Sequence, residues 1–447
     1  MSRLNYLLIV VDSLREDHIH RRARTPCLNS LDERGYVRFD QAYTTECWTF
    51  PSHMSMFTGL MPSVHGSTFQ NMEYRCKWMT AAEILRQSGY ATHLITRNTV
   101  FDGSIEGACR GFWTREMPIA QGWSPLDLLA VLAKPRVRSM IQKTGFFGPA
   151  QKDSREFLSR IMRLGTPADE MALSETYHQM AHDRRTATPS FTFVNLYDMH
   201  LPYPPVRDSS QPPPTTWDNL NEIGAAIRAL PRIASHEYLE DGFRLDESDQ
   251  RAIRRRYAKA AELMDEKISA FLMRCEAAGL LEDTVVIITS DHGEAFGEHG
   301  LWGHDASVYD IHTHVPLFIK HPRFDGGRTS DIVSLRDLYD VLTGPEEHSI
   351  LEPAARAKSP LACSEHIPYR TSAPVKKEYR KRQAAVKMPD GRKIVARGSR
   401  LSIYGEHDKH ELQPHQIDKH TAFRVLRHHA SDSHACEAFG YLVEAGG

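Results

Sequence analysis

The segment LNYLLIVVD, residues 4–12, is an apolar run that stops at a carboxylate. The run is too short to cross a membrane, and its length suits a strand that is buried on both faces. Comparable runs recur further along the chain, at 91–96, 190–196, 284–289 and 315–320. Helical patterns lie between them, at 79–88, 249–278 and 334–342. This alternation predicts an α/β fold in which a largely parallel central sheet is covered by helices on both faces.

Polar, chemically capable residues follow several of these runs. In sheets of this kind, ligands bind outside the carboxyl ends of the strands. We therefore expect the functional site at that edge of the sheet. The residues found there are Asp12, Asn98, Asp198, His200, Asp291 and His292.

The rhythm of strands and helices is interrupted twice and then changes. Residues 103–180, with a helical segment at 126–132, and the proline-rich residues 202–245 are expected to form a cap over the sheet edge. Short strand patterns at 383–388, 393–396 and 400–404 precede a predicted helix at 416–429. We therefore predict a catalytic α/β domain over 1–355. A small C-terminal unit over 356–447 should hold an antiparallel sheet and a helix.

The composition is that of an ordinary globular protein. Of the 447 residues, 41% are hydrophobic and 25% are charged, and the formal net charge is −2. A net charge this close to zero does not indicate nucleic-acid binding, which is typical of strongly basic proteins. With no membrane span or cleavage signal in view, we expect a cytoplasmic protein that acts on a small molecule. The seven cysteines contain no CxxC pair and resemble reduced structural thiols rather than a disulfide frame or a zinc site. The oligomeric state is not readable from the sequence.

A second informative segment is TTECWTFPSHMSMFTGLMPSVHG, residues 44–66. It places Thr49 just ahead of Pro51, and proline is preferred in the first turn of a helix. The unpaired N–H groups and the dipole at a helix start favour bound anions. This position suits a nucleophile that attacks phosphorus or sulfur. Taken alone, the pattern fits a helix-capping threonine equally well.

The loop TSDHGEAFGEHGLWGHD, residues 289–305, is unusually rich in potential ligands and proton carriers. Asp291 and His292 follow the strand, and Glu294 and His304 come shortly after. A solvated turn rarely concentrates so many such groups, so the loop is predicted to line a site. Two other positions stay open when taken alone. Asp12 is either a metal ligand or a helix cap, and His200 is either functional or packed against a tyrosine.

Together, four segments resemble the sulfatase branch of the alkaline phosphatase superfamily. They are VVDSLREDH, WTFPSHMSMFTGLMPSVHG, YDMHLPY, and SDHGE with LWGHD, and they occur in the family's order over residues 4–320. The resemblance implies that Asp12, Asp291 and His292 bind a divalent cation, with Thr49 as nucleophile and further ligand. Oxygen and imidazole donors admit Mg, Ca, Mn or Zn. One ion is expected, because Ser13 stands where the family has a second aspartate.

The same resemblance assigns the remaining site residues. It implies that His200 and His304 hold the substrate's oxyanion or protonate the leaving group. A second ion is expected only if these two histidines and Asp198 converge. His53 stands where the family motif has an arginine. The predicted substrate-binding residues are His53, Asn98 and Trp302.

One departure from the family pattern bears on the reaction. Sulfatases that use formylglycine need Cys or Ser at the nucleophile position, where this chain has Thr49; Cys47 lies two residues earlier. Threonine at this position resembles family members that act on phosphorus. We therefore predict a metal-dependent hydrolase of a phosphate or phosphonate monoester or diester, working through a covalent intermediate on Thr49.

Three other readings are weighed against this hydrolase. A sulfatase without formylglycine and a phosphoryl transferase or mutase would use the same site. A binding protein that has lost activity is disfavoured, because SDHGE and His200 are retained.

Overall fold

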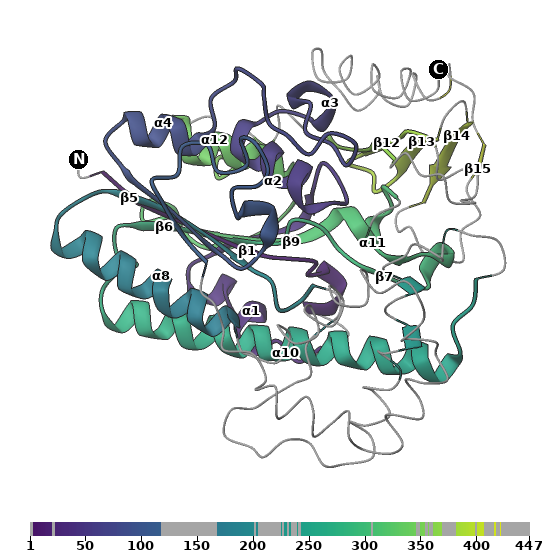
Figure 1. Cartoon of the computed structure of the whole chain (residues 1–447), viewed down its shortest axis with the longest axis horizontal. Coiled ribbons are helices and arrows are strands. Elements are labelled where there is room, and N and C mark those ends of the chain that lie inside the picture. The colour runs from purple at the N-terminus through teal and green to yellow at the C-terminus, as the bar shows by residue number, and fades with distance from the viewer. Residues whose placement is uncertain are drawn as a thin grey trace.

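The computed structural model places an eight-stranded sheet at the centre of the molecule (Figure 1). It describes residues 3–19, 23–117, 168–200, 203, 225, 228–229, 232–233, 239, 243–304, 307–345, 349–353, 356, 361–368, 381–397, 400–405, 415–416 and 421. The strand order is β10 (Gly327–Ser334), β2 (Val37–Tyr43), β9 (His314–Lys320), β6 (Thr284–Thr289), β1 (Asn5–Val11), β5 (Ser190–Leu196), β3 (Ala91–Thr96) and β4 (Thr114–Glu116). All neighbours pair in parallel except β9, which is antiparallel to both β2 and β6. The predicted, largely parallel α/β sheet is confirmed.

Helices cover both faces of this sheet, as the alternation of side chains along β1 requires. Leu7, Ile9 and Val11 point into one hydrophobic cluster, with α8 (Ala168–Arg185) and α10 (Glu247–Ala277). Leu8 and Val10 point into the other, with α2 (Thr49–Thr58), α4 (Ala81–Gln87) and α12 (Leu338–Thr343). Figure 1 shows these two helical layers on opposite sides of the sheet. Among the described residues, none of the helices combines the length and apolar character that spanning a bilayer requires.

Shorter helices and turns connect the layers. They are α1 (Pro26–Asn29), η2 (Asp32–Arg34), α3 (Pro62–His65), η3 (Thr99–Phe101), η5 (Glu298–Gly300), α11 (Asp310–Thr313) and η6 (Leu335–Asp337). A two-stranded ribbon, β7 (Ala295–Phe296) with β8 (Trp302–Gly303), forms in the loop after β6. That loop carries much of the predicted site.

The C-terminal sheet is antiparallel, as predicted, and its strands follow one another in chain order. They are β11 (Ala362–His366), β12 (Gln383–Lys387), β13 (Lys393–Arg397), β14 (Arg400–Tyr404) and β15 (His415–Gln416). β11 fastens this sheet to the segment ahead of α2. The Ser364 hydroxyl donates to Thr44 O at 2.6 Å, and Glu365 N–H donates to Thr45 O at 2.8 Å.

Parts of the predicted insertions belong to the central fold. β4 and the start of α8 lie within 103–180, where they extend the sheet and one helical layer. The expected helix at 126–132, most of 202–245 and most of the expected helix at 416–429 lie outside the described residues. The cap remains a prediction.

Candidate active site

Two neighbouring parallel strands, β1 and β6, deliver the central residues of the site to one edge of the sheet. Asp12 follows β1 directly, and Asp291 and His292 follow β6. One ligand atom from each of these three residues lies within 4.8 Å of the others. All three side chains are fully buried. The predicted metal-binding residues therefore meet in space.

Asp12 is held in place by two side-chain donors. The Ser13 hydroxyl donates to Oδ1 at 2.9 Å, and Asn98 Nδ2 donates to Oδ2 at 3.0 Å. The other end of the Asn98 amide is also engaged, because Oδ1 accepts the N–H of Val100 at 3.0 Å. Asn98 thus orients a carboxylate in this structure. Its predicted role in substrate binding stays a prediction.

Asp291 has one satisfied and, in the described part of the chain, one unsatisfied carboxylate oxygen. Its Oδ1 accepts the backbone N–H of Ser13 at 3.1 Å and the backbone N–H of His292 at 3.0 Å. Oδ2 is buried and has no hydrogen-bond partner among the residues that the structure describes. Burial, and then the charge of Asp12, raise the pKa of Asp291 well above its usual value. Two buried carboxylates with an orphaned oxygen fit a bound cation, which would satisfy both.

His292 presents a nitrogen lone pair to the same point. Its Nδ1 donates to the carbonyl of Gly293 at 3.0 Å, so the neutral ring has its lone pair on Nε2. Nε2 lies 3.4 Å from Asp291 Oδ2 and 3.2 Å from Thr49 Oγ1. A backbone bond to the second ring nitrogen is how metal-binding histidines are usually oriented.

Thr49 is the first residue of α2 and does not act as its cap. The N-cap is Trp48, and no side chain caps this helix start. The Thr49 hydroxyl, almost fully buried, is turned toward the His292 ring instead. One turn further on, the Ser52 hydroxyl donates to the carbonyl of Asp291 at 2.7 Å. This bond ties the helix that carries the predicted nucleophile to the loop that carries the predicted ligands.

His53 is completely buried below Thr49. Its Nδ1 donates to Thr49 O at 2.8 Å and lies 3.7 Å from Asp291 Oδ2. Its ring packs edge-on against Phe101 and Phe193, at centroid distances of 5.1 and 5.5 Å. Burial lowers the pKa of His53 to about 4, so the ring is neutral at pH 7. In this structure His53 supports the backbone of the nucleophile, and its predicted contact with substrate stays a prediction.

The two predicted proton carriers lie beside His292. The ring of His304 stacks on it at 4.3 Å, and His200 meets His304 edge-on at 5.1 Å. Glu294 accepts from Nδ1 of His304 at 3.2 Å. His200 is half-buried and stacks on Tyr197 at 4.5 Å. The loops after β5 and β6 thus form one row of imidazoles.

Two other residues considered from the sequence lie elsewhere. Asp198 forms an ion pair of 2.7 Å with Lys267 from α10. Its negative charge is therefore balanced by that lysine, which does not favour its predicted contribution to a second metal ion. Trp302 belongs to the hydrophobic cluster under α8 and α10 and is 5% exposed. Its assignment to substrate binding stays a prediction.

Tyr257 is a supporting residue that the sequence did not reveal. It lies in α10, where its hydroxyl donates to Ser13 O at 2.6 Å and accepts the N–H of Arg15 at 2.9 Å. Ser13 has a φ of 63°, a strained value for a residue with a side chain. The tyrosine therefore stabilises the turn that aims Asp12 and the Ser13 N–H at the site. No sequence signal marks it, because a buried tyrosine in a long helix reads as core.

Comparisons with known proteins agree with this geometry. A family model described as Sulfatase matches residues 4–340. The chain belongs to the sulfatase family. This membership confirms the predicted family.

Among sulfatase-family relatives, the chain is 24% identical to human iduronate 2-sulfatase over 353 residues, which are 74% of this chain and 61% of that protein. It is 25% identical to choline-sulfatase of Rhizobium meliloti over 344 residues, 71% of this chain and 62% of the relative. The chain thus spans about 60% of the length of these relatives. The crystal structure of a phosphonate monoester hydrolase of Agrobacterium radiobacter has a TM-score of 0.61 and 18% identity, covering 99% of this chain and 96% of that one. At that identity the likeness supports the fold alone.

Proposed function

We propose that this chain is a divalent-metal-dependent hydrolase of phosphoric or phosphonic esters, with Thr49 Oγ1 as its nucleophile. One observation carries the proposal. Thr49 Oγ1 lies 3.2 Å from His292 Nε2, at the point where Asp12 and Asp291 also present buried oxygens. A hydroxyl held at a helix start among these donors is placed to react with an anionic ester.

The donor set fits a cation of the magnesium, calcium, manganese or zinc kind. Asp12, Asp291 and His292 would hold it, and the unpartnered Asp291 Oδ2 is the oxygen that most needs it. When bound, such an ion lowers the pKa of a nearby hydroxyl and neutralises charge on the oxygens of the transferred group. Asn98 and Ser13 keep Asp12 in position for this task.

The remaining chemistry belongs to the chain's own side chains. Thr49 Oγ1 gives up its proton to solvent and attacks phosphorus, and the ester oxygen leaves, taking a proton from His200 or His304. That histidine regains a proton from solvent. Because His304 donates to Glu294 through Nδ1, its proton transfer to the leaving oxygen would take place at Nε2. Water then cleaves the threonine ester and restores the hydroxyl. One ester and one water give one alcohol and one phosphate or phosphonate.

A second candidate is sulfate-ester hydrolysis by the unmodified threonine. Its support is the sulfatase names of the relatives, human iduronate 2-sulfatase and choline-sulfatase. The same residues would act, with sulfur in place of phosphorus. A transferase would differ only in the final step, where an alcohol replaces water.

One assay separates these reactions. Phosphate monoesters and diesters, phosphonate esters and a sulfate ester of one phenol are incubated with the metal-free chain and added Mg²⁺, Mn²⁺, Ca²⁺ or Zn²⁺. We expect the phosphorus esters to be cleaved faster than the sulfate ester, with release of free phosphate or phosphonate. Faster cleavage of the sulfate ester would replace the proposal with the sulfatase candidate. Transfer to an added alcohol without free phosphate would identify a transferase.

A further inference from the structure

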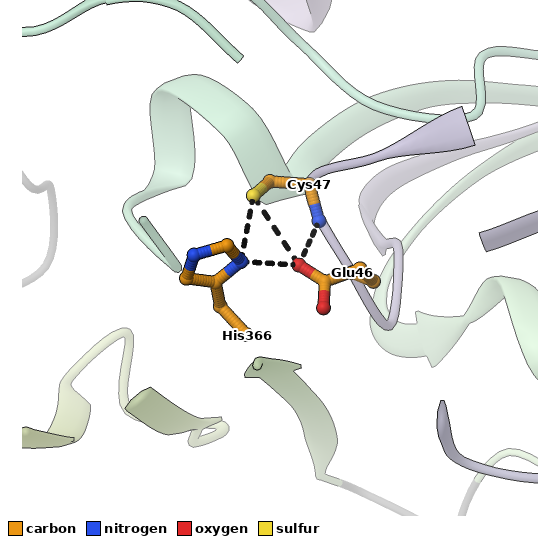
Figure 2. Close-up of side chains that lie close together, drawn as sticks. All are labelled: Glu46, Cys47 and His366. Atoms are coloured by element: carbon orange, nitrogen blue, oxygen red, sulfur yellow. Dashed lines mark hydrogen bonds and ion pairs between the residues drawn. The ribbon is translucent and has the colours of Figure 1, made fainter. Parts of the chain in front are cut away.

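A second buried cluster of metal-ligating side chains lies where the C-terminal sheet meets the segment ahead of α2. It consists of Glu46, Cys47 and His366, and Figure 2 shows the three side chains converging. Glu46 and Cys47 come from the connection between β2 and α2, and His366 ends β11. Each is at most 2% exposed.

We propose that Glu46, Cys47 and His366 form a metal site that takes a thiophilic divalent cation of the zinc type. Zinc is commonly bound by thiolate, imidazole and carboxylate together. The cluster around Asp291 has no sulfur donor, so the two sites differ in the ions they favour. The proposed ion would join two parts of the fold that are far apart in sequence.

The spacing of the ligand atoms fits such an ion. At usual zinc bond lengths, two donors of a tetrahedral site lie about 3.3–3.6 Å apart. Cys47 Sγ lies 3.5 Å from His366 Nδ1 and 3.3 Å from Glu46 Oε1. His366 Nδ1 and Glu46 Oε1 are 2.9 Å apart, the length of the hydrogen bond that an ion would replace. Seating the ion requires these two atoms to separate by about 0.5 Å, which a small torsion of the Glu46 side chain supplies.

The charges also favour a dication. Glu46 is fully buried, and within the described parts of the chain it pairs with His366 and with no lysine or arginine. A divalent ion bound to one carboxylate, one thiolate and one neutral imidazole gives a neutral cluster. The Cys47 thiol would release its proton to solvent on binding. Full burial of Cys47 also argues against a reactive thiol, because a substrate or oxidant must reach a cysteine to react with it.

The site would brace the nucleophile segment from the side of the C-terminal sheet. Cys47 lies two residues before Thr49. The neighbouring bonds from Ser364 to Thr44 and from Glu365 to Thr45 already attach β11 to the same segment. An ion bound by Cys47 and His366 would add a cross-link stronger than these two hydrogen bonds between the same two segments.

Cobalt substitution tests the proposal without relying on activity. Co²⁺ is titrated into the metal-free full-length chain, and absorption from thiolate-to-cobalt charge transfer is followed in the near ultraviolet. We expect this absorption to saturate at the intensity of one thiolate-bound Co²⁺ per chain in the wild type, in addition to any Co²⁺ that Asp12, Asp291 and His292 bind. It should disappear in Cys47→Ser, and His366→Gln should weaken Co²⁺ binding at the thiolate at least about 10-fold. Cys275→Ser, which removes another buried cysteine, should leave the absorption unchanged.

Two results would overturn the proposal: no thiolate absorption in the wild type, or absorption that persists in Cys47→Ser. Circular dichroism checks that each variant is folded. If Cys47→Ser does not fold, the wild type and His366→Gln still decide. Asp291→Asn separates this site from the proposed catalytic one, because it should keep the absorption while losing metal-dependent turnover. Zinc retained by purified Asp291→Asn and absent from the double variant Asp291→Asn/Cys47→Ser would give independent support.

Discussion

The two buried clusters, Asp12–Asp291–His292 and Glu46–Cys47–His366, differ in how well they are satisfied without an ion. In the first, Asp291 Oδ2 is buried without a hydrogen-bond partner among the described residues, and the pKa of Asp291 is raised by burial and by Asp12. In the second, Glu46 Oε1 accepts from Cys47 N–H and from His366. The first arrangement is destabilising unless a cation is present, which is typical of a functional site. The second holds its shape through hydrogen bonds, which suits a structural role.

Replacing the nucleophile should have the largest effect. Thr49→Ala removes the hydroxyl that faces His292, and we expect turnover of the best ester to fall at least about 1,000-fold. Thr49→Ser keeps a hydroxyl and is the matched control, with measurable activity. Steady-state kinetics on both variants, after circular dichroism, provide the measurement. Near-normal rates in the alanine variant would exclude Thr49 as the nucleophile.

Asp291→Asn should separate function from stability. We expect kcat/KM to fall more than about 100-fold, because a metal ligand is lost. In EDTA at pH 7, however, the variant should be more stable than the wild type. A carboxyl whose folded pKa lies above its unfolded pKa contributes its full stabilisation below the unfolded pKa and loses it as the pH rises through the folded pKa. Its ionised form therefore destabilises the fold at neutral pH. Urea unfolding in EDTA measures this, and a less stable variant would contradict the account of the empty cluster.

Asn98→Ala should weaken metal binding without abolishing it. The variant loses the donor to Asp12 Oδ2, and outer contacts of this kind typically change metal affinity 10- to 100-fold. Metal titration followed by activity gives the apparent affinity. Asn71→Ala, at an exposed asparagine, is the control. An unchanged metal affinity with a raised KM would instead favour the substrate-binding role predicted from the sequence.

His65, which belongs to neither cluster, should give a small and separable pH effect. Burial lowers its pKa to about 3, while Ser67 N–H donates to Nδ1 at 3.1 Å. Between pH 6.5 and 3 the unfolded chain therefore binds a proton that the folded chain does not, so stability falls as the pH falls. At pH 5.5 this amounts to about 1.4 kcal/mol. His65→Gln should reduce the loss of unfolding free energy between pH 7.5 and 5.5 by about that amount, whereas the exposed His178→Gln should not.

The sequence predicted the strands whose two faces are both buried. The ranges 91–96, 190–196 and 284–289 match β3, β5 and β6, because continuous apolar runs are typical of such strands. It did not predict β2 or β10. β10 is the edge strand and reads GRTSDIVS, with its first half largely exposed, so its polar residues resemble a loop. Its place in the sheet depends on pairing with β2, which a single sequence does not show.

The site residues differ in the same way, because some are marked by a local sequence pattern and others only by contacts between distant segments. Asp12, Asp291 and His292 were expected at one edge of the sheet because they stand at strand ends, and the family resemblance assigned them to a cation. The cluster at Cys47 was not predicted, because His366 lies 320 residues from Glu46 and no motif spans that distance. Asn98 and His53 were assigned to substrate from their positions. In the structure, Asn98 also holds Asp12 and His53 also holds the Thr49 carbonyl.

The setting of α2 has a consequence for how this chain could acquire new substrates. Every residue from Thr49 to Thr58 is buried, so the helix is enclosed along its whole length. Repositioning it would disrupt the packing on all sides of it at once, and a compact interior resists such a change. Adaptation is therefore expected at the partly exposed residues around His200 rather than in α2. Libraries randomised at those residues should yield altered ester preference far more often than libraries randomised in α2.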